Sequence, residues 1–136
     1  MNKRILVVDD DQNISMLLQL QLAKAGYDVI TASSGLLALD LIETQKPDLI
    51  LLDLMLPDMD GAEVCRRLRA IETMVPVIML TAYTGPKSMK TAVEAGIDDY
   101  IEKPFRKDEL LMRIKSHLDR VEMVPVSLSI LGDQPM

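Results

Sequence analysis

The sequence predicts a doubly wound α/β domain built on a five-stranded parallel sheet, and three observations lead to this prediction. Five short apolar runs alternate with five stretches whose apolar residues repeat at helical spacing. Strands that alternate with amphipathic helices require parallel pairing with right-handed crossovers. The length of 136 residues suits a single domain, and 49% apolar with 26% charged residues is ordinary for a globular protein.

The apolar runs are short and rich in branched aliphatic residues, which is typical of strands. We expect strands within residues 4–8, 27–32, 48–53, 76–80 and 99–102. The third run, Leu-Ile-Leu-Leu, has no alternation of polar and apolar residues, which indicates a strand buried on both faces.

The helical stretches follow the strands in order. The first has apolar residues at i+4 spacing and stops at Gly26; the second can be capped by Ser33 and Ser34 and is closed by Pro47. The apolar stripe of the third helix consists of Val64, Leu68 and Ile71. The fourth helix covers about 87–95, before a glycine, and the fifth about 107–121.

The end of the chain has a different composition. Residues 122–136 contain two prolines, a glycine and no lysine or arginine. We therefore expect residues 1–121 to form the domain, and residues 122–136 to be a tail or the start of a linker to a further domain.

Composition and charge exclude several classes of function. The net charge of −6 argues against a nucleic-acid face on this chain. One cysteine cannot form an internal disulfide, and one histidine cannot form a histidine cluster for a metal. No apolar run is long enough to span a membrane and no signal peptide is evident, so we expect a cytoplasmic protein without membrane contact.

Chemically useful side chains lie where the predicted strands end. Asp9 and Asp10 end the first strand, Asp53 the third and Thr81 the fourth, while Lys103 follows the fifth. In an open parallel sheet these ends meet at one edge, where ligands bind. Clustered carboxylates repel one another, and a hard divalent cation such as Mg²⁺ relieves that repulsion.

This set of residues suits phosphoryl transfer. A carboxylate can attack phosphorus and form an acyl phosphate, which we expect of Asp53. Asp9 and Asp10 would hold the metal, and Lys103 and Thr81 would receive the phosphoryl oxygens, because that transition state needs its charge neutralised.

The motifs around these residues resemble the response-regulator receiver domain of two-component signalling. The resemblance extends from residue 3 to about 121 and rests on four segments, which are 7–11, 51–57, 79–82 and 99–105. It implies a CheY-like, flavodoxin-like fold with strand order 2-1-3-4-5.

The resemblance also implies a role for each site residue. Asp53 matches the phosphoacceptor, Asp10 the carboxylate bound directly to Mg²⁺ or Mn²⁺, and Asp9 the carboxylate that acts mainly through water. Met55 matches the position that offers a backbone carbonyl to the metal. The remaining matches are Lys103 as the conserved lysine with a cis bond to Pro104, Thr81 and Tyr100 as the switch pair, and Ala82 as the backbone N–H donor to the phosphoryl group.

The implied function is a signalling phosphoacceptor that catalyses only its own phosphorylation and dephosphorylation. Its expected partner is a sensor histidine kinase or a phosphotransfer protein, and the face made by the fourth helix, fifth strand and fifth helix would control a downstream output. A homodimer that forms on phosphorylation through this face is a further expectation, although Met89 stands where relatives usually carry a basic residue.

Two alternatives from other classes share features of this pattern. A haloacid-dehalogenase-like phosphatase also uses an aspartyl nucleophile, but it needs an acid two positions later, where this chain has Met55. A flavodoxin-like electron carrier needs a phosphate-binding loop after the first strand and aromatic residues to stack the flavin. This chain has three aspartates in that loop, no tryptophan and one phenylalanine.

Overall fold

The computed structural model, which describes residues 2–71, 74–82 and 85–132, shows strands and helices in strict alternation. The strands are β1 (Arg4–Val8), β2 (Asp28–Ala32), β3 (Leu49–Leu52), β4 (Val77–Thr81) and β5 (Asp99–Glu102). The helices are α1 (Gln12–Lys24), α2 (Gly35–Gln45), α3 (Gly61–Ile71), α4 (Pro86–Ala95) and α5 (Lys107–Gly132). All neighbouring strands pair in parallel, in the order β2-β1-β3-β4-β5, which confirms the predicted fold class.

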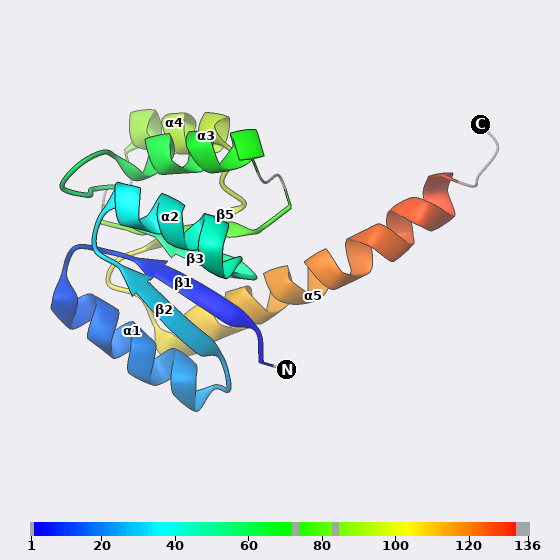
Figure 1. Cartoon of the computed structure of the whole chain (residues 1–136), viewed down its shortest axis with the longest axis horizontal. Helices are drawn as coiled ribbons and strands as arrows, with labels where there is room; N and C mark the ends of the chain where they lie inside the picture. Colours follow the sequence, from blue (N-terminus) through cyan, green and yellow to red (C-terminus); the bar gives the residue numbers. More distant parts are fainter. Residues whose placement is uncertain (1, 72–73, 83–84, 133–136) are drawn as a thin grey trace.

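The sheet is covered on both faces (Figure 1). Helices α2, α3 and α4 pack on one face, and α1 and α5 pack on the other. Successive residues of each strand contribute to opposite faces, so Ile50 and Leu52 of β3 join the first core while Leu49 and Leu51 join the second. The four apolar residues of β3 are all buried, as the absence of alternation predicts.

The helix ends follow local sequence signals. Asp11 caps α1 by accepting hydrogen bonds from the backbone N–H groups of Asn13 and Ile14, and the Ser34 side chain caps α2. Gly26 and Gly96, which lie just beyond α1 and α4, have φ angles of 99° and 103°. These left-handed conformations favour glycine and end both helices.

The ends of α3 and α5 differ from the sequence prediction. Ile71, expected in the apolar stripe of α3, is 64% exposed, because it is the last residue of that helix and lies near Pro76, ahead of the first residue of β4. It lines a surface hollow of about 420 Å³ together with Pro47 and Pro76.

Helix α5 does not end near residue 121 but continues to Gly132 (Figure 1). Position 125 of this helix is a proline, which has no backbone N–H to donate. The division into a domain at 1–121 and a tail at 122–136 stays a prediction, and residues 133–136 lie outside the described part of the chain. None of the helices in the described ranges is both long enough and apolar enough to cross a bilayer.

Candidate functional site

The carboxyl edge of the sheet brings together side chains from distant parts of the sequence. Asp9 and Asp10 follow β1, Asp53 follows β3, and Lys103 follows β5. The Nζ atom of Lys103 lies 2.8 Å from Oδ2 of Asp9 and 3.5 Å from Oδ2 of Asp53. Both distances are short enough for ion pairs, so one ammonium group lies between two carboxylates that are 44 residues apart in the sequence.

Asp53 lies in a buried and strongly charged environment. Its backbone N–H donates to the Val8 carbonyl at 2.9 Å, and the residue is 8% exposed. Burial raises the pKa of the Asp53 carboxyl, with an additional increase from the charge of Asp9, while Lys103 and the Met55 backbone N–H lower it in part. Because the net pKa is raised, the ionised carboxylate reduces stability at neutral pH, and this penalty is relieved as the pH falls through the raised value.

Asp9 is buried, and its carboxylate accepts two hydrogen bonds. Its Oδ1 atom accepts a hydrogen bond from the Asp11 backbone N–H at 2.9 Å, and its Oδ2 atom accepts one from Lys103. Asp10, in contrast, is exposed at the rim of the site. The pair therefore combines a fixed inner carboxylate with an accessible outer one.

The acidic residues fit a divalent cation. Asp9, Asp10 and Asp53 each place a carboxylate oxygen within 4.8 Å of the others, the only such group among the described residues. Oxygen-only donors with open access suit Mg²⁺, which retains several water ligands. A cation here would also relieve the repulsion between Asp9 and Asp53 that raises the pKa of Asp53. The Met55 carbonyl stays a predicted ligand.

The remaining predicted site residues lie at the ends of β4 and β5. Thr81 is fully buried as the last residue of β4, and its carbonyl accepts a hydrogen bond from the Lys103 backbone N–H at 2.9 Å. Ala82 follows and is exposed. Tyr100 is partly buried and packs against the core on the α2–α3–α4 face of the sheet. The peptide bond between Lys103 and Pro104 is cis, as the resemblance implies.

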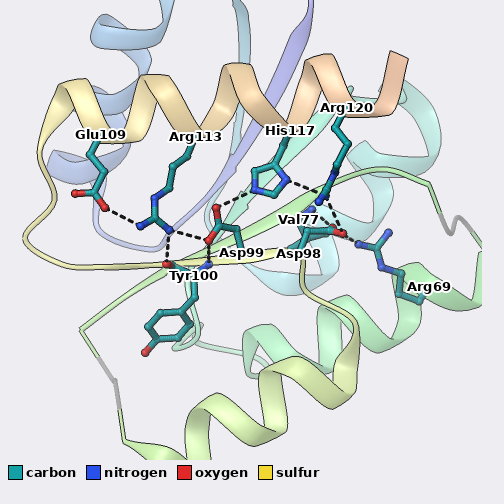
Figure 2. A network of polar contacts seen from close by, with 9 residues as sticks. All are labelled: Arg69, Val77, Asp98, Asp99, Tyr100, Glu109, Arg113, His117 and Arg120. Atoms are coloured by element: carbon teal, nitrogen blue, oxygen red, sulfur yellow. Dashed lines mark hydrogen bonds and ion pairs between the residues drawn. The ribbon is translucent and has the colours of Figure 1, made fainter. Parts of the chain in front are cut away.

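A second polar cluster connects β5 to α5 (Figure 2). Asp99 accepts a hydrogen bond from Arg113 at 2.8 Å and contacts Nε2 of His117 at 2.8 Å. Arg113 also pairs with Glu109 at 3.0 Å and donates to the Tyr100 carbonyl. The Tyr100 ring points away from α5 (Figure 2), so its backbone contacts the cluster while its side chain faces the other layer.

The histidine in this cluster has a defined hydrogen-bonding pattern. Its Nδ1 atom lies 2.9 Å from Nη2 of Arg120, which can only donate, and its Nε2 atom faces the acceptor Asp99. The neutral His117 tautomer with its proton on Nε2 satisfies both contacts. The His117 side chain is largely buried.

The sequence did not reveal the contacts of the β3–α3 loop, which runs from Leu54 to Asp60. Asp58 in this loop accepts hydrogen bonds from the backbone N–H groups of Gly35 and Leu36, at 2.8 and 2.9 Å. No local pattern connects residues that are 22 and 23 positions apart. A proline–aspartate pair after Asp53 indicated only a turn.

Comparison with known proteins identifies relatives of the whole chain. A family model described as "Response regulator receiver domain" matches residues 5–115. The chain is 49% identical over 134 residues to the alkaline phosphatase synthesis transcriptional regulatory protein PhoP of Bacillus subtilis, covering 98% of this chain and 56% of that protein. It is 44% identical to the DNA-binding response regulator MtrA of Mycolicibacterium smegmatis, with 98% and 58% covered. The chain thus spans little more than half the length of these relatives.

Solved structures give the same result. A CheY-like response regulator receiver domain protein from Methanospirillum hungatei matches with a TM-score of 0.87 and 36% identity, covering 90% of this chain and 98% of that one. The BeF3-activated receiver domain of RstA from Klebsiella pneumoniae matches with a TM-score of 0.81 and 36% identity, with 85% and 98% covered.

Proposed function

Because the chain belongs to the response regulator receiver domain family, we propose that Asp53 accepts a phosphoryl group from a phosphohistidine of a partner protein. The chain is a signalling protein of the two-component class. The observation that carries the proposal is the buried Asp53 carboxylate, which lies 3.5 Å from Lys103 and beside two further carboxylates.

The proposed transfer conserves atoms and charge. An oxygen of the Asp53 carboxylate attacks phosphorus, the P–N bond to the partner's imidazole breaks, and its electron pair returns to the ring nitrogen. Lys103 neutralises charge on the phosphoryl oxygens, and the Thr81 hydroxyl and Ala82 N–H donate hydrogen bonds to them. Asp9, Asp10, Asp53 and the Met55 carbonyl would hold Mg²⁺, which would neutralise further charge on the phosphoryl group.

Water later hydrolyses the acyl phosphate and restores Asp53. The chain therefore catalyses only its own phosphorylation and dephosphorylation and does not turn over a separate substrate.

Intact-mass spectrometry after incubation with a phosphorylated histidine kinase or phosphotransfer protein tests the proposal. It should show one added phosphoryl group for each chain, in the presence of Mg²⁺ or Mn²⁺ only.

Mg²⁺ should stabilise the fold through the same acidic residues. A ligand that binds only the folded state stabilises it by about 2.7 kcal/mol at 100 times its Kd. We expect Asp10→Asn to raise the melting temperature of the metal-free protein, because it removes one of three clustered negative charges. The same substitution should erase the Mg²⁺-induced increase, which differential scanning calorimetry measures; an undiminished increase would contradict the assignment of Asp10.

The relatives suggest how the signal continues. PhoP and MtrA are described as transcriptional and DNA-binding regulators, and this chain matches a little over half of each. We propose that the domain switches the output of a longer protein in the cytoplasm and does not itself contact nucleic acid, consistent with its charge of −6.

Phosphorylation would also favour a homodimer through the α4–β5–α5 face, where Asp99 and Arg113 already form an ion pair within one chain.

Thr81 and Tyr100 would couple the site to that face. Phosphorylation adds negative charge and strong acceptor oxygens at Asp53, which would draw the Thr81 hydroxyl inward and let the Tyr100 ring fill the space. We expect Thr81→Ala to accept phosphate but to lose about 1.5–3 kcal/mol of this coupling, the value of a hydrogen bond to a charged group.

Beryllofluoride, which stands in for the phosphoryl group, allows a direct measurement. Amide chemical shifts of α4 and β5 should respond less in Thr81→Ala than in the parent protein, and light scattering should show less self-association. Identical shift changes in both proteins would show that Thr81 does not carry the coupling.

A further inference from the structure

The β3–α3 loop beside Asp53 is held in place at its base and at its tip. At the base, the Gly61 backbone N–H donates to the Leu54 carbonyl at 2.6 Å, and Met55 and Asp60 form an antiparallel bridge. The Met55 backbone N–H lies near enough to the Asp53 carboxyl to lower its pKa. The conformation of this loop therefore determines where the Met55 backbone lies relative to the Asp53 carboxylate.

At the tip, Asp58 connects the loop to a different helix. Its Oδ1 and Oδ2 atoms accept hydrogen bonds from the backbone N–H groups of Gly35 and Leu36, the first two residues of α2. Such N–H groups have no partner within their own helix, and a carboxylate is favourable at this end of the helix dipole. One side chain thus satisfies two donors and fixes the loop to α2.

The neighbouring residue reinforces this connection. Met59 packs so closely on Gly35 that a Cβ atom at position 35 would lie 2.5 Å from Cγ of Met59. Glycine at position 35 therefore leaves room for the Met59 side chain against the start of α2. Two adjacent loop residues contact the same turn of α2, one through polar and one through apolar atoms.

We propose that Asp58 is a positioning residue for the acidic site, which holds the β3–α3 loop so that the Met55 backbone and Asp53 are arranged for cation binding. Asp58 contacts neither Asp53 nor the other clustered acids, so it acts through the loop. The inference rests on the proposed function of Asp53 and on the proposed Met55 ligand. It predicts that breaking the Asp58–α2 contact weakens Mg²⁺ binding.

The contact between the Asp58 carboxylate and the start of α2 should persist at neutral pH. The backbone N–H groups of Gly35 and Leu36 hold the pKa of the Asp58 carboxyl below its usual value. A carboxyl with a lowered pKa contributes stability above its unfolded-state pKa and loses that contribution as the pH falls through the lowered value. The Asp58 contact is therefore present throughout the neutral range.

A test must separate the contact from the charge of Asp58, since any nearby negative charge attracts a cation. Leu36→Pro removes one of the two N–H donors and leaves the Asp58 carboxylate unchanged. Proline is tolerated in the first turn of a helix, as Pro86 in α4 of this protein shows. Leu36→Ala is the matched control, because it removes the same exposed side chain and keeps the N–H.

Mg²⁺ titration followed by amide chemical shifts gives the Kd directly. Residues that support metal ligands change affinity by about 10–100-fold when mutated, so we expect a roughly tenfold weaker Kd for Asp58→Ala and roughly threefold for Leu36→Pro. Leu36→Ala should bind like the parent protein. The rate of phosphorylation by acetyl phosphate at saturating Mg²⁺ should change less than the Kd does.

Two further measurements exclude a general loss of stability. In the metal-free protein, the Gly35 amide should exchange with solvent faster in Asp58→Ala than in the parent. Asp48→Ala, which removes a carboxylate that accepts the Arg4 backbone N–H at the opposite end of the sheet, should leave the Mg²⁺ Kd unchanged.

The outcomes distinguish this inference from the proposed function. Equal Mg²⁺ affinity in Leu36→Pro and Leu36→Ala, with Asp53 still phosphorylated in both, would overturn the role of Asp58 alone. If Leu36→Pro does not fold, equal Mg²⁺ affinity in Asp58→Ala and Asp48→Ala would overturn it. Phosphorylation at a residue other than Asp53 would overturn the proposed function instead.

Discussion

Asp53→Asn should lose all Mg²⁺-dependent labelling by acetyl phosphate or by a phosphorylated histidine kinase. The asparagine amide carries no negative charge and is a poor nucleophile toward phosphorus, so no acyl phosphate can form at position 53. Intact-mass spectrometry should show one phosphoryl group on the parent protein and none on the variant. The label on the parent should be stable to acid and labile to alkali, as expected of an acyl phosphate.

The same variant should be more stable than the parent in the absence of metal. Burial raises the pKa of the Asp53 carboxyl, so its ionised form opposes folding at neutral pH, and the neutral amide removes that penalty. Asp28→Asn, at an exposed position on β2, is the matched control and should be labelled as well as the parent. Full labelling of Asp53→Asn would show that another residue is the acceptor.

The second substitution with a large expected effect is Gly61→Ala, at the start of α3. A Cβ atom at this position would overlap the backbone carbonyl oxygen of Asp53 and would lie 3.1 Å from the Leu54 Cα. Backbone atoms cannot rotate away, so Gly61→Ala must displace the segment that carries Asp53. We expect a loss of about 3 kcal/mol of stability, the upper end of overpacking penalties. We also expect roughly 100-fold slower phosphorylation, because a 1 Å displacement of a reacting group has about that effect.

Gly85→Ala provides the control for this substitution. Apart from its chain neighbours, no atom of the described residues lies within 4 Å of a Cβ atom at Gly85, and the residue has an ordinary φ of −64°. Gly85 is the N-cap of α4, where alanine is less favourable than glycine, so urea unfolding should place Gly85→Ala within about 1 kcal/mol of the parent. Phosphorylation of Gly61→Ala at the parental rate would mean that the position of the Asp53 backbone does not limit the reaction.

The sequence predicted the features that depend on local chemistry. Apolar runs and helical spacing identified every strand and helix in order, and the bounds of β1 and β5 were as expected. Parallel pairing then places all strand ends at one edge, so the convergence of Asp9, Asp53 and Lys103 follows from the order of elements alone.

The features that were missed depend on contacts between distant segments or on where an element ends. Helical spacing identifies the buried face of α3 but not where the sheet stops beneath it, so Ile71 was wrongly expected in the core. Proline and glycine suggested that the last helix ends near residue 121, yet α5 continues to Gly132. The contacts of Asp58 with α2 and of His117 with Asp99 join segments that are distant in the sequence, and no periodicity encodes them.

The central claim is that Asp53 carries the phosphoryl group, and borohydride reduction tests it most directly. Reduction converts an aspartyl phosphate to homoserine, which peptide sequencing by mass spectrometry locates at a single position. After incubation of the parent protein with acetyl phosphate and Mg²⁺, homoserine should occur at position 53 and should be absent when EDTA is added. Homoserine at Asp9 or Asp10, or a phosphorylated protein with no homoserine at all, would contradict the account.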